Sequence, residues 1–244
     1  MPWLPQAASS NAGAMDFVLL LVHLLMLVLF VGWAAYFGWV LVRFRAGRQK
    51  EPNARGPRGG LATWTEVGVV AAEGILLVVF ALPVWFRQTA PPPRDPDAVT
   101  VRVVAEQYVW NVHYPGADGH FGTTSVALLA PTNPLGLDRT APFGADDLAT
   151  QNVLHVPVNR QVVIQLSSKD VIHSFGLPNF RVKQDVIPGM LSTVWFTPTV
   201  TGSFDIACSQ LCGLGHFRMK GTVVVESDAD FRAYLTSEAA LIGR

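Results

Sequence analysis

The sequence predicts two membrane-spanning helices followed by an all-β domain outside the membrane. Three observations indicate this fold class. Half of the 244 residues are hydrophobic and only 15% are charged, which is apolar for a soluble protein. Two long apolar runs lie before residue 90. After them the pattern changes to short runs rich in β-branched and aromatic residues, which is typical of strands.

The first apolar run, residues 17–42, contains no Lys, Arg or Glu. As a helix it would be roughly 39 Å long at about 1.5 Å per residue, enough to cross about 30 Å of hydrocarbon with a tilt. A cleaved signal peptide is the alternative. No basic residue precedes Arg43, and the run exceeds the ~7–15 apolar residues of a signal peptide, so we favour a transmembrane helix.

The second apolar run, residues 61–86, contains Glu66 and Glu73. The loop between the runs, residues 43–60, carries six basic residues and one acid. Positively charged loops remain in the cytoplasm. We therefore expect the lipid bilayer as one partner, with the N-terminal segment 1–16, a Pro-rich linker 87–98 and the domain 99–244 all outside, in a bacterial-type plasma membrane.

The outer domain reads as an antiparallel sandwich or barrel, because no amphipathic helices alternate with its strands. The expected strands are residues 99–104, 108–114, 153–158, 161–167, 192–197, 203–207 and 222–226, and one helix is expected from Asp228 to about Ile242. Residues 115–150 read as a long surface excursion. After Phe86 there are twelve basic and 14 acidic residues, so we expect no nucleic-acid partner and only a weak preference for basic ones.

One short segment, CSQLCGLGHFRM, holds both cysteines of the chain, Cys208 and Cys212, together with His216 and Met219. A disulfide is the ordinary expectation for two exported cysteines. It does not require the nearby His and Met, however. All four side chains are soft or borderline donors, the set that suits copper rather than calcium or magnesium.

Two thiolates are one too many for a mononuclear blue-copper site, which uses one Cys, two His and a weak Met. Two cysteines separated by three residues can instead each bridge two copper ions, and each copper then needs one imidazole. His216 is one candidate, and His173, far upstream in KDVIHSFGLPNF, is the best candidate for the other. We interpret His23, His113, His120 and His155 as packing, surface or helix-contact residues.

With these residues in place, the chain resembles subunit II of the haem-copper respiratory oxidases, the cytochrome c oxidase family, over nearly its whole length. The likeness includes the two helices, the pair Trp64-Thr65, the segment EQYVWNVHYPG, the segment DVIHSFGLPNFRVKQDVIPG and the cysteine cluster. The last two are the specific motifs.

The resemblance implies a cupredoxin-like Greek-key barrel that carries the binuclear copper centre called CuA. By this match Cys208 and Cys212 bridge two copper ions and His173 and His216 each bind one. Met219 and the backbone carbonyl of Gln210 are then weak ligands. The implied role is a relay in a proton-translocating oxidase. It would accept electrons from cytochrome c or a similar donor and pass them to haem in subunit I, where oxygen becomes water.

The sequence departs from the family pattern at three places. Gln210 stands where many members have a Glu that helps to bind magnesium, so we do not expect magnesium. Tyr108 stands where a Trp usually receives the electron, which leaves Tyr108 and Trp110 as candidates for that step. Leu61 replaces an acid near a proton path, and Glu66 is our candidate substitute.

Two rival interpretations remain at this point. The subunit II of some haem-copper nitric oxide reductases is similar, and the gas chemistry there occurs on another chain. A membrane-anchored copper chaperone or thiol oxidoreductase can also use two cysteines and a distant His. In that class, however, the cysteines begin a helix of a thioredoxin-like fold, whereas here a glycine-rich loop follows them.

Overall fold

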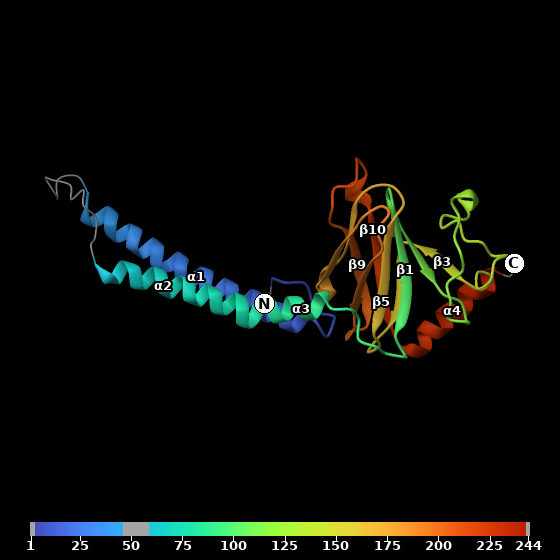
Figure 1. The fold of residues 1–244 in the computed structure, drawn as a ribbon, viewed down its shortest axis with the longest axis horizontal. Helices are drawn as coiled ribbons and strands as arrows, with labels where there is room; N and C mark the ends of the chain where they lie inside the picture. Colours follow the sequence, from blue (N-terminus) through green and yellow to red (C-terminus); the bar gives the residue numbers. More distant parts are fainter. Residues whose placement is uncertain (1–2, 46–58, 243–244) are drawn as a thin grey trace. The chain divides into compact units, whose positions relative to one another are not determined.

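This computed structural model describes residues 3–45 and 59–242, which divide into two compact units. The first unit contains Ala14–Ala90 and is helical. The second consists of the described parts of Pro2–Gly13 and Pro91–Arg244 and is built mainly of strands (Figure 1). Four basic residues of the expected cytoplasmic loop, Arg48, Lys50, Arg55 and Arg58, lie outside the described residues.

Both apolar runs are helices. The first, α1, covers Ala12–Arg43, and the second runs from Gly60 to Thr89 without a break. Each is long and apolar enough to cross a membrane, and neither buries its most apolar stretch within the chain. Phe17 and Phe80 meet edge to face at 6.1 Å, and Gln88 Nε2 lies 3.4 Å from Met15 Sδ. Both helices are longer than the expected 17–42 and 61–86: the first gains residues 12–16 and Arg43, and the second gains Gly60 and residues 87–89.

The second helix changes its winding in the middle. It consists of α2 (Gly60–Ile75), a π-helical stretch η1 (Leu76–Ala81) and α3 (Leu82–Thr89). Pro83 lies at the start of α3. Proline has no N–H to donate, and its ring clashes with the carbonyl four residues earlier, which here belongs to Val79. A widened π turn is one way in which a helix accommodates such a residue.

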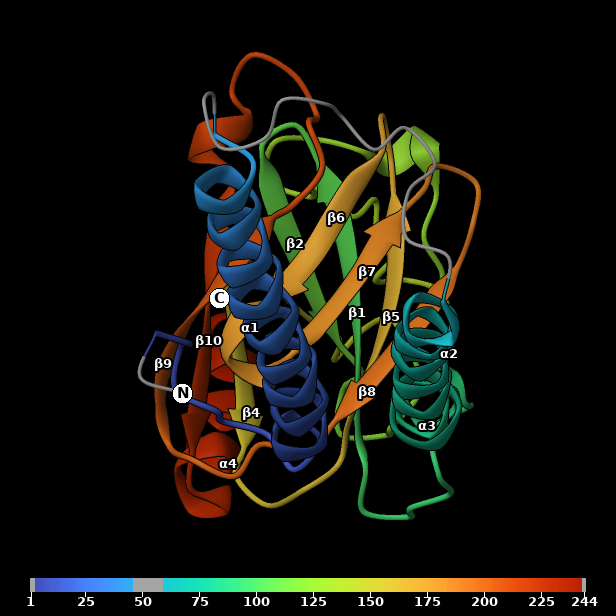
Figure 2. The same ribbon diagram turned by 90° about the vertical axis from the view of Figure 1, so that its left-hand side faces the viewer.

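Among the described residues, ten strands form two five-stranded sheets. The first has the order β3 (Leu148–Gln151), β2 (Val109–Tyr114), β1 (Val99–Glu106), β5 (Val162–Ser168) and β8 (Ser192–Phe196). The second has the order β4 (Val153–Pro157), β10 (Lys220–Glu226), β9 (Gly202–Cys208), β6 (His173–Leu177) and β7 (Val182–Val186). In Figure 2, β6 and β7 lie side by side with β1 and β2 behind them. The helix α4 (Asp228–Ile242) follows β10, as expected.

The pairing departs from a purely antiparallel sandwich. β1 pairs with β5 in parallel, and β4 pairs with β10 in parallel, while the other ladders are antiparallel. The sequence pattern could not reveal this, because strand direction depends on connections that cross between sheets rather than on the side chains.

Three strands were not expected from the sequence: β3, β6 and β7. β6 reads HSFGL, and all five of its residues are buried. Ser and Gly have a poor strand propensity, so the segment has no local strand signal. It forms a strand because it is hydrogen-bonded between β7 and β9 in the middle of the second sheet.

The space between the two sheets is filled by large apolar side chains, among them Trp110, Phe175, Phe180, Phe196 and Ile206, all fully buried. Trp110 contacts Phe175 edge to face at 5.4 Å. Burying a side chain of this size contributes roughly 1.5–3 kcal/mol to stability. The core therefore fixes the inner ends of the strands that carry the cysteine cluster.

The segment before α1 packs onto this strand unit. The Ala8 amide donates to the Asn179 carbonyl at 2.8 Å, and the Thr199 amide donates to the Ala8 carbonyl at 2.9 Å. Ser9 Oγ donates to the Phe180 carbonyl at 2.8 Å. Because Ala8 is fully buried in the core, this segment is part of the domain and not a free tail.

The long excursion expected over residues 115–150 covers the outer face of the first sheet, and only its end forms a strand, β3. It is fixed by Asp147, which is fully buried. Its carboxylate lies 2.6 Å from His113 Nε2 and accepts the amides of Gly122 at 2.7 Å and Gly116 at 3.2 Å. Burial lowers the pKa of His113, and the contact with Asp147 opposes that shift.

We expect Asp147→Ala to destabilise the outer unit by about 3 kcal/mol, because it leaves His113 and two backbone amides without an acceptor in a buried place. The measurement is urea unfolding of the full chain in detergent, followed by tryptophan fluorescence. Asp146→Ala is the control, since its carboxylate accepts only one long bond, 3.4 Å from the Asp118 amide. Equal stability losses in the two variants would contradict this account of the excursion.

Candidate metal centre

The pairing of β6 with β9 brings the ligand candidates together. The two strands are antiparallel, with Phe175 opposite Cys208. The first residue of β6, His173, therefore lies at the same end of the second sheet as the last residue of β9, Cys208. His173 begins a strand of its own, β6, and is separated from the preceding strand, β5, which ends at Ser168.

The loop after β9, residues 209–219, returns directly to the sheet because Lys220 pairs with Ala207. The Cys208 amide donates to the Met219 carbonyl at 3.3 Å and the Ser209 amide to the Ser174 carbonyl at 2.9 Å. A short 3₁₀ turn, His216–Arg218, precedes Met219. Both ends of the loop are thus fixed to strands. The candidate metal donors within the loop lie over this end of the second sheet.

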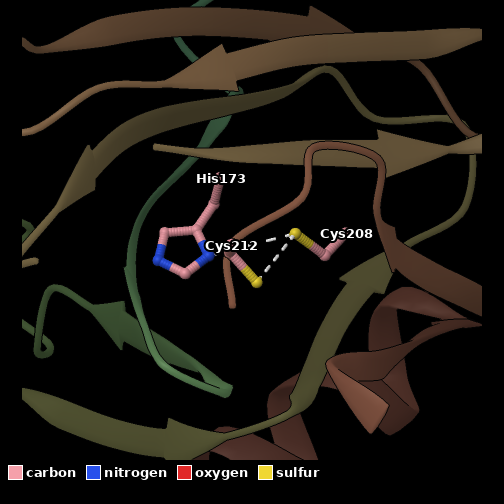
Figure 3. A group of neighbouring side chains, drawn as sticks. All are labelled: His173, Cys208 and Cys212. Carbon is pink, nitrogen blue, oxygen red and sulfur yellow. Dashed lines mark hydrogen bonds between the residues drawn. The ribbon is translucent and has the colours of Figure 1, made fainter. Parts of the chain in front are cut away.

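Six candidate metal donors lie close together at this end of the second sheet. Cys208 Sγ and Cys212 Sγ are 3.8 Å apart. Cys208 Sγ lies 3.9 Å from His173 Nδ1 and 3.3 Å from the Gln210 carbonyl oxygen. Cys212 Sγ lies 3.5 Å from His216 Nδ1 and 3.7 Å from Met219 Sδ. Figure 3 shows an imidazole nitrogen of His173 directed at the two sulfurs.

The donors form two similar halves around the pair of sulfurs. Each thiol has one imidazole nitrogen and one weaker donor beside it: His173 and the Gln210 carbonyl for Cys208, His216 and the thioether of Met219 for Cys212. His173, Cys212 and Met219 are buried, and Cys208 and His216 are half-buried. This is the donor set that suits two soft or borderline metal ions that share bridging sulfurs.

The cysteines are free thiols, and a sulfur separation of 3.8 Å is far from the roughly 2.05 Å of a disulfide. They also lie between two antiparallel strands, β9 and β10, and do not begin a helix. The described structure therefore matches neither a structural disulfide nor a thioredoxin-like thiol site.

Tyr108 explains two glycines of the loop. A Cβ on Gly215 would lie 2.5 Å from the Tyr108 ring, and a Cβ on Gly213 would lie 2.7 Å from its hydroxyl oxygen. Gly213 also has φ +139°, which side chains rarely adopt. The loop can pass this closely only without side chains at these positions. Tyr108 is therefore half-buried against the loop and is not an exposed residue on a strand edge.

Gln107 and Asp170 connect the two halves of the centre without contributing a donor. Asp170 Oδ1 lies 2.9 Å from His173 Nε2, and Asp170 Oδ2 accepts the Gln107 backbone amide at 2.7 Å. The side chain of Gln107 in turn donates to the Cys212 carbonyl at 2.6 Å. This chain of bonds fixes which nitrogen of His173 faces the sulfurs, which is the usual task of residues around a metal site.

Electrostatics favours a cation at this place. Burial, with the neighbouring Cys208, raises the pKa of the Cys212 thiol from 9.0 to about 11. Two adjacent thiolates are therefore unfavourable without a positive charge between them. Burial would raise the pKa of Asp170, but hydrogen bonds from His173 and two backbone amides outweigh it and lower that pKa. Asp170 is thus an anion that supports His173.

The other sequence candidates lie elsewhere. Trp110 is fully buried, with its ring 6.2 Å from that of His173, so it cannot touch a donor protein directly. Glu66 and Glu73 are exposed on α2, within the helical unit. His155 stacks on Tyr234 at 3.6 Å and His120 contacts Phe143 at 5.0 Å. His23 contacts the Leu19 carbonyl in its own helix.

Sequence reasoning did not identify the hydrogen bonds that Gln107 and Asp170 make around the centre. Gln107 has no local signal, because it acts on Asp170 and on the Cys212 carbonyl, both far away in the sequence. Asp170 is only three residues from His173, so the spacing of these two residues could have indicated their contact. The segment EQYVW, which contains Gln107 and connects β1 to β2, was the one indication that these two strands belong to the centre.

Comparison with known proteins shows which family the chain belongs to. Residues 99–228 match the family described as "Cytochrome C oxidase subunit II, periplasmic domain". An "Alternative cytochrome c oxidase subunit 2" of Bradyrhizobium diazoefficiens is 33% identical over 245 residues, which covers 99% of this chain and 86% of the relative. The chain belongs to the cytochrome c oxidase subunit II family.

Two further relatives are informative. A cytochrome c oxidase subunit 2 of Cereibacter sphaeroides is 36% identical over 206 residues, covering 79% of this chain and 65% of the relative. The crystal structure of the periplasmic domain of subunit II of the Bradyrhizobium japonicum cytochrome oxidase is 33% identical, covers 62% of this chain and 98% of that one, and has a TM-score of 0.46. Family membership confirms the expected fold class, two apolar helices followed by a cupredoxin-like β domain, and makes the chain one subunit of an oxidase.

In the metal-free, reduced protein we expect Cys212 to be alkylated about a hundredfold more slowly at pH 8 than in the unfolded chain, since a rise of two pKa units lowers the thiolate fraction by that factor. The rate should increase with pH up to about 11, where the thiol ionises. Iodoacetamide labelling of the full chain, read by peptide mass spectrometry, measures it. Equal rates for Cys212 in folded and urea-unfolded chain would contradict the assigned burial.

We expect Gln107→Glu to weaken copper retention by roughly 10–100-fold, because the new carboxylate cannot donate to the Cys212 carbonyl. Chelator competition on the copper-loaded full chain measures this. Gln184→Glu on β7 is the matched control, since the Gln184 amide bonds only the Asp185 carbonyl, at 3.2 Å. Retention that is the same in both variants would remove Gln107 from the support of the centre.

Proposed function

We propose that this chain is the electron-accepting subunit of a respiratory haem-copper oxidase and that its metal centre is a binuclear CuA site. Cys208 and Cys212 would bridge two copper ions, His173 and His216 would each bind one, and Met219 and the Gln210 carbonyl would be weak ligands. The observation that carries the proposal is a pair of unbonded sulfurs 3.8 Å apart, each with its own imidazole nitrogen within 3.9 Å.

The bound copper pair supplies a redox centre that takes up and releases one electron at a time. The chain contributes rigidity. Its ligands come from the ends of β6 and β9 and from a loop fixed at both ends, while Asp170 and Gln107 hold His173 and Cys212. Ligands that cannot move between oxidation states keep the reorganisation small, which favours fast electron transfer.

The donor and acceptor are other proteins. We propose cytochrome c or a similar carrier as the donor and haem in subunit I as the acceptor, with reduction of oxygen to water there. Leu211, Leu214 and Phe217 on the cysteine loop are 79%, 98% and 83% exposed. Exposed apolar side chains gathered over one loop are typical of a surface that a partner covers. Transfer of the electrons to a subunit that reduces nitric oxide stays the alternative.

Three finer assignments remain proposals. Tyr108 contacts the cysteine loop, which supports it as the residue through which electrons reach the centre. Trp110 would take part only through the protein interior. Glu66 as a substitute in a proton path still rests on its position in the sequence. We propose no magnesium, since the side chain of Gln210 is an amide and not a carboxylate.

We further propose that both ends of the chain lie outside a bacterial-type plasma membrane. The segment around Ala8 is hydrogen-bonded to Asn179 and Thr199 of the β domain, so the N-terminus and that domain share one side of the membrane. An even number of crossings between them, as two spanning helices provide, is consistent with this arrangement, and the basic loop 43–60 would then face the cytoplasm.

Electron paramagnetic resonance of the copper-loaded full chain in detergent tests the centre. We expect hyperfine splitting from two equivalent copper nuclei, because both ions share the same pair of sulfurs. Cys212→Ser should abolish the binuclear signal, whereas His120→Ala should leave it unchanged. A one-copper pattern in the unaltered chain would refute the proposed site.

A further inference from the structure

A hollow of about 380 Å³ lies between the outer face of the first sheet and the excursion of residues 115–147. Its floor is formed by residues of β1, β2 and β5, and its rim by residues 124–135 of the excursion. This volume is within the range of small-molecule sites, roughly 300–1,000 Å³. Long excursions of this kind within a compact domain often have a function.

The strand register determines which side chains form the floor. Arg102 on β1 lies opposite His113 on β2 and opposite Gln165 on β5. Two residues further along, Val104 lies opposite Ser167. The intervening residues of β1 belong to the core between the sheets. Because side chains alternate between the two faces of a strand, this row projects outward, toward the excursion.

Arg102 is held in a fixed position. Its Nε donates to Gln165 Oε1 at 3.0 Å, and its guanidinium carbon lies 4.0 Å from the centre of the Phe121 ring. Within residues 3–45 and 59–242, its two terminal nitrogens have no hydrogen-bond partner. A planar guanidinium held at one edge presents its other donors as a fork, which matches a carboxylate.

The other charges around the hollow are already compensated within the described residues. Lys169 Nζ lies 2.8 Å from Glu106 Oε2 and also donates to the Pro134 carbonyl. His113 is paired with the buried Asp147. Burial lowers the pKa of Arg102, an effect that Asp147 opposes from a distance. Arg102 is therefore a partly desolvated cation without a direct counterion.

The remaining lining combines aliphatic side chains with polar ones, which include Thr124, Ser125 and Ser168. The aliphatic side chains come from the sheet, the excursion and the loop before β8, namely Val104, Val126, Leu129, Leu135 and Leu191. Val126 is 84% exposed and Leu191 66% exposed at the mouth of the hollow. Aliphatic side chains beside a guanidinium and several hydroxyl groups suit an organic molecule that has both an apolar body and a charged group.

We propose that this hollow binds a small organic acid, with its carboxylate on the terminal nitrogens of Arg102 and its apolar body against the aliphatic side chains. The hydroxyl of Ser167, beside Val104 on the floor, is a further donor within the hollow. The site does not include any residue of the metal centre, so the proposal is independent of the function proposed above.

Fluorine NMR with 4-(trifluoromethyl)benzoate and the full chain in detergent tests the site. We expect saturable binding with a Kd below about 1 mM, and binding at least tenfold weaker in Arg102→Gln, since a charge-assisted pair is lost. Arg94→Gln, which removes an exposed cation of the linker with no hydrogen bond or ion pair among the described residues, should bind as the unaltered chain does. The uncharged 4-(trifluoromethyl)benzamide measures partition into the micelle and should not saturate.

Ser167→Phe keeps Arg102 but fills the hollow, so it should also abolish binding of the benzoate. Circular dichroism of each variant verifies that the β domain is folded. Absence of saturable binding by the unaltered chain up to about 5 mM overturns the proposal. Equal binding by Arg102→Gln, or equal binding of the benzamide, also overturns it.

Discussion

The antiparallel pairing of β6 with β9 is the constraint on which the metal centre depends. Neither strand carries more than one candidate ligand, and the two candidates, His173 and Cys208, are 35 residues apart in the sequence. The pairing aligns the start of β6 with the end of β9, so that His173 and Cys208 lie at the same end of the second sheet. A shift of one residue in this register would direct His173 to the opposite face of the sheet. The large buried side chains beneath this end of the sheet, among them Trp110 and Phe175, hold the register.

The rest of the centre is a loop whose shape is set by its neighbours. Residues 209–219 have little regular structure of their own, but the glycines let them pass close to Tyr108, and Gln107 fixes the Cys212 carbonyl. The short hairpin connection between β1 and β2 therefore acts as a template for the loop although it supplies no ligand. This arrangement separates two tasks. The second sheet positions the donors, and the first sheet limits how far they can move.

How much of this could be predicted from the sequence differs between elements. The helices, most strands and the group of Cys208, Cys212, His216 and Met219 were recognisable, because apolar runs and a dense group of soft donors are local signals. His173 was a candidate only because the cysteines needed a second imidazole, and the Gln210 carbonyl came from the family resemblance. β6 was not recognisable, since HSFGL has no strand pattern and becomes a strand only between its two partners. The parallel pairs, the support from Gln107 and the buried pair of His113 with Asp147 were also hidden. Each depends on residues far apart in the sequence whose proximity is set by the fold.

The attachment of the N-terminal segment has a consequence for the order in which the molecule can be completed. Ser9 bonds to Phe180, 171 residues later in the chain. Ser9 therefore leaves the ribosome long before Phe180, to which it bonds, has been synthesised. Contacts of such high sequence separation form late, because the chain between them must first be ordered. The residues around Ser9 are thus synthesised well before Phe180 but are among the last to reach their final place in the β domain.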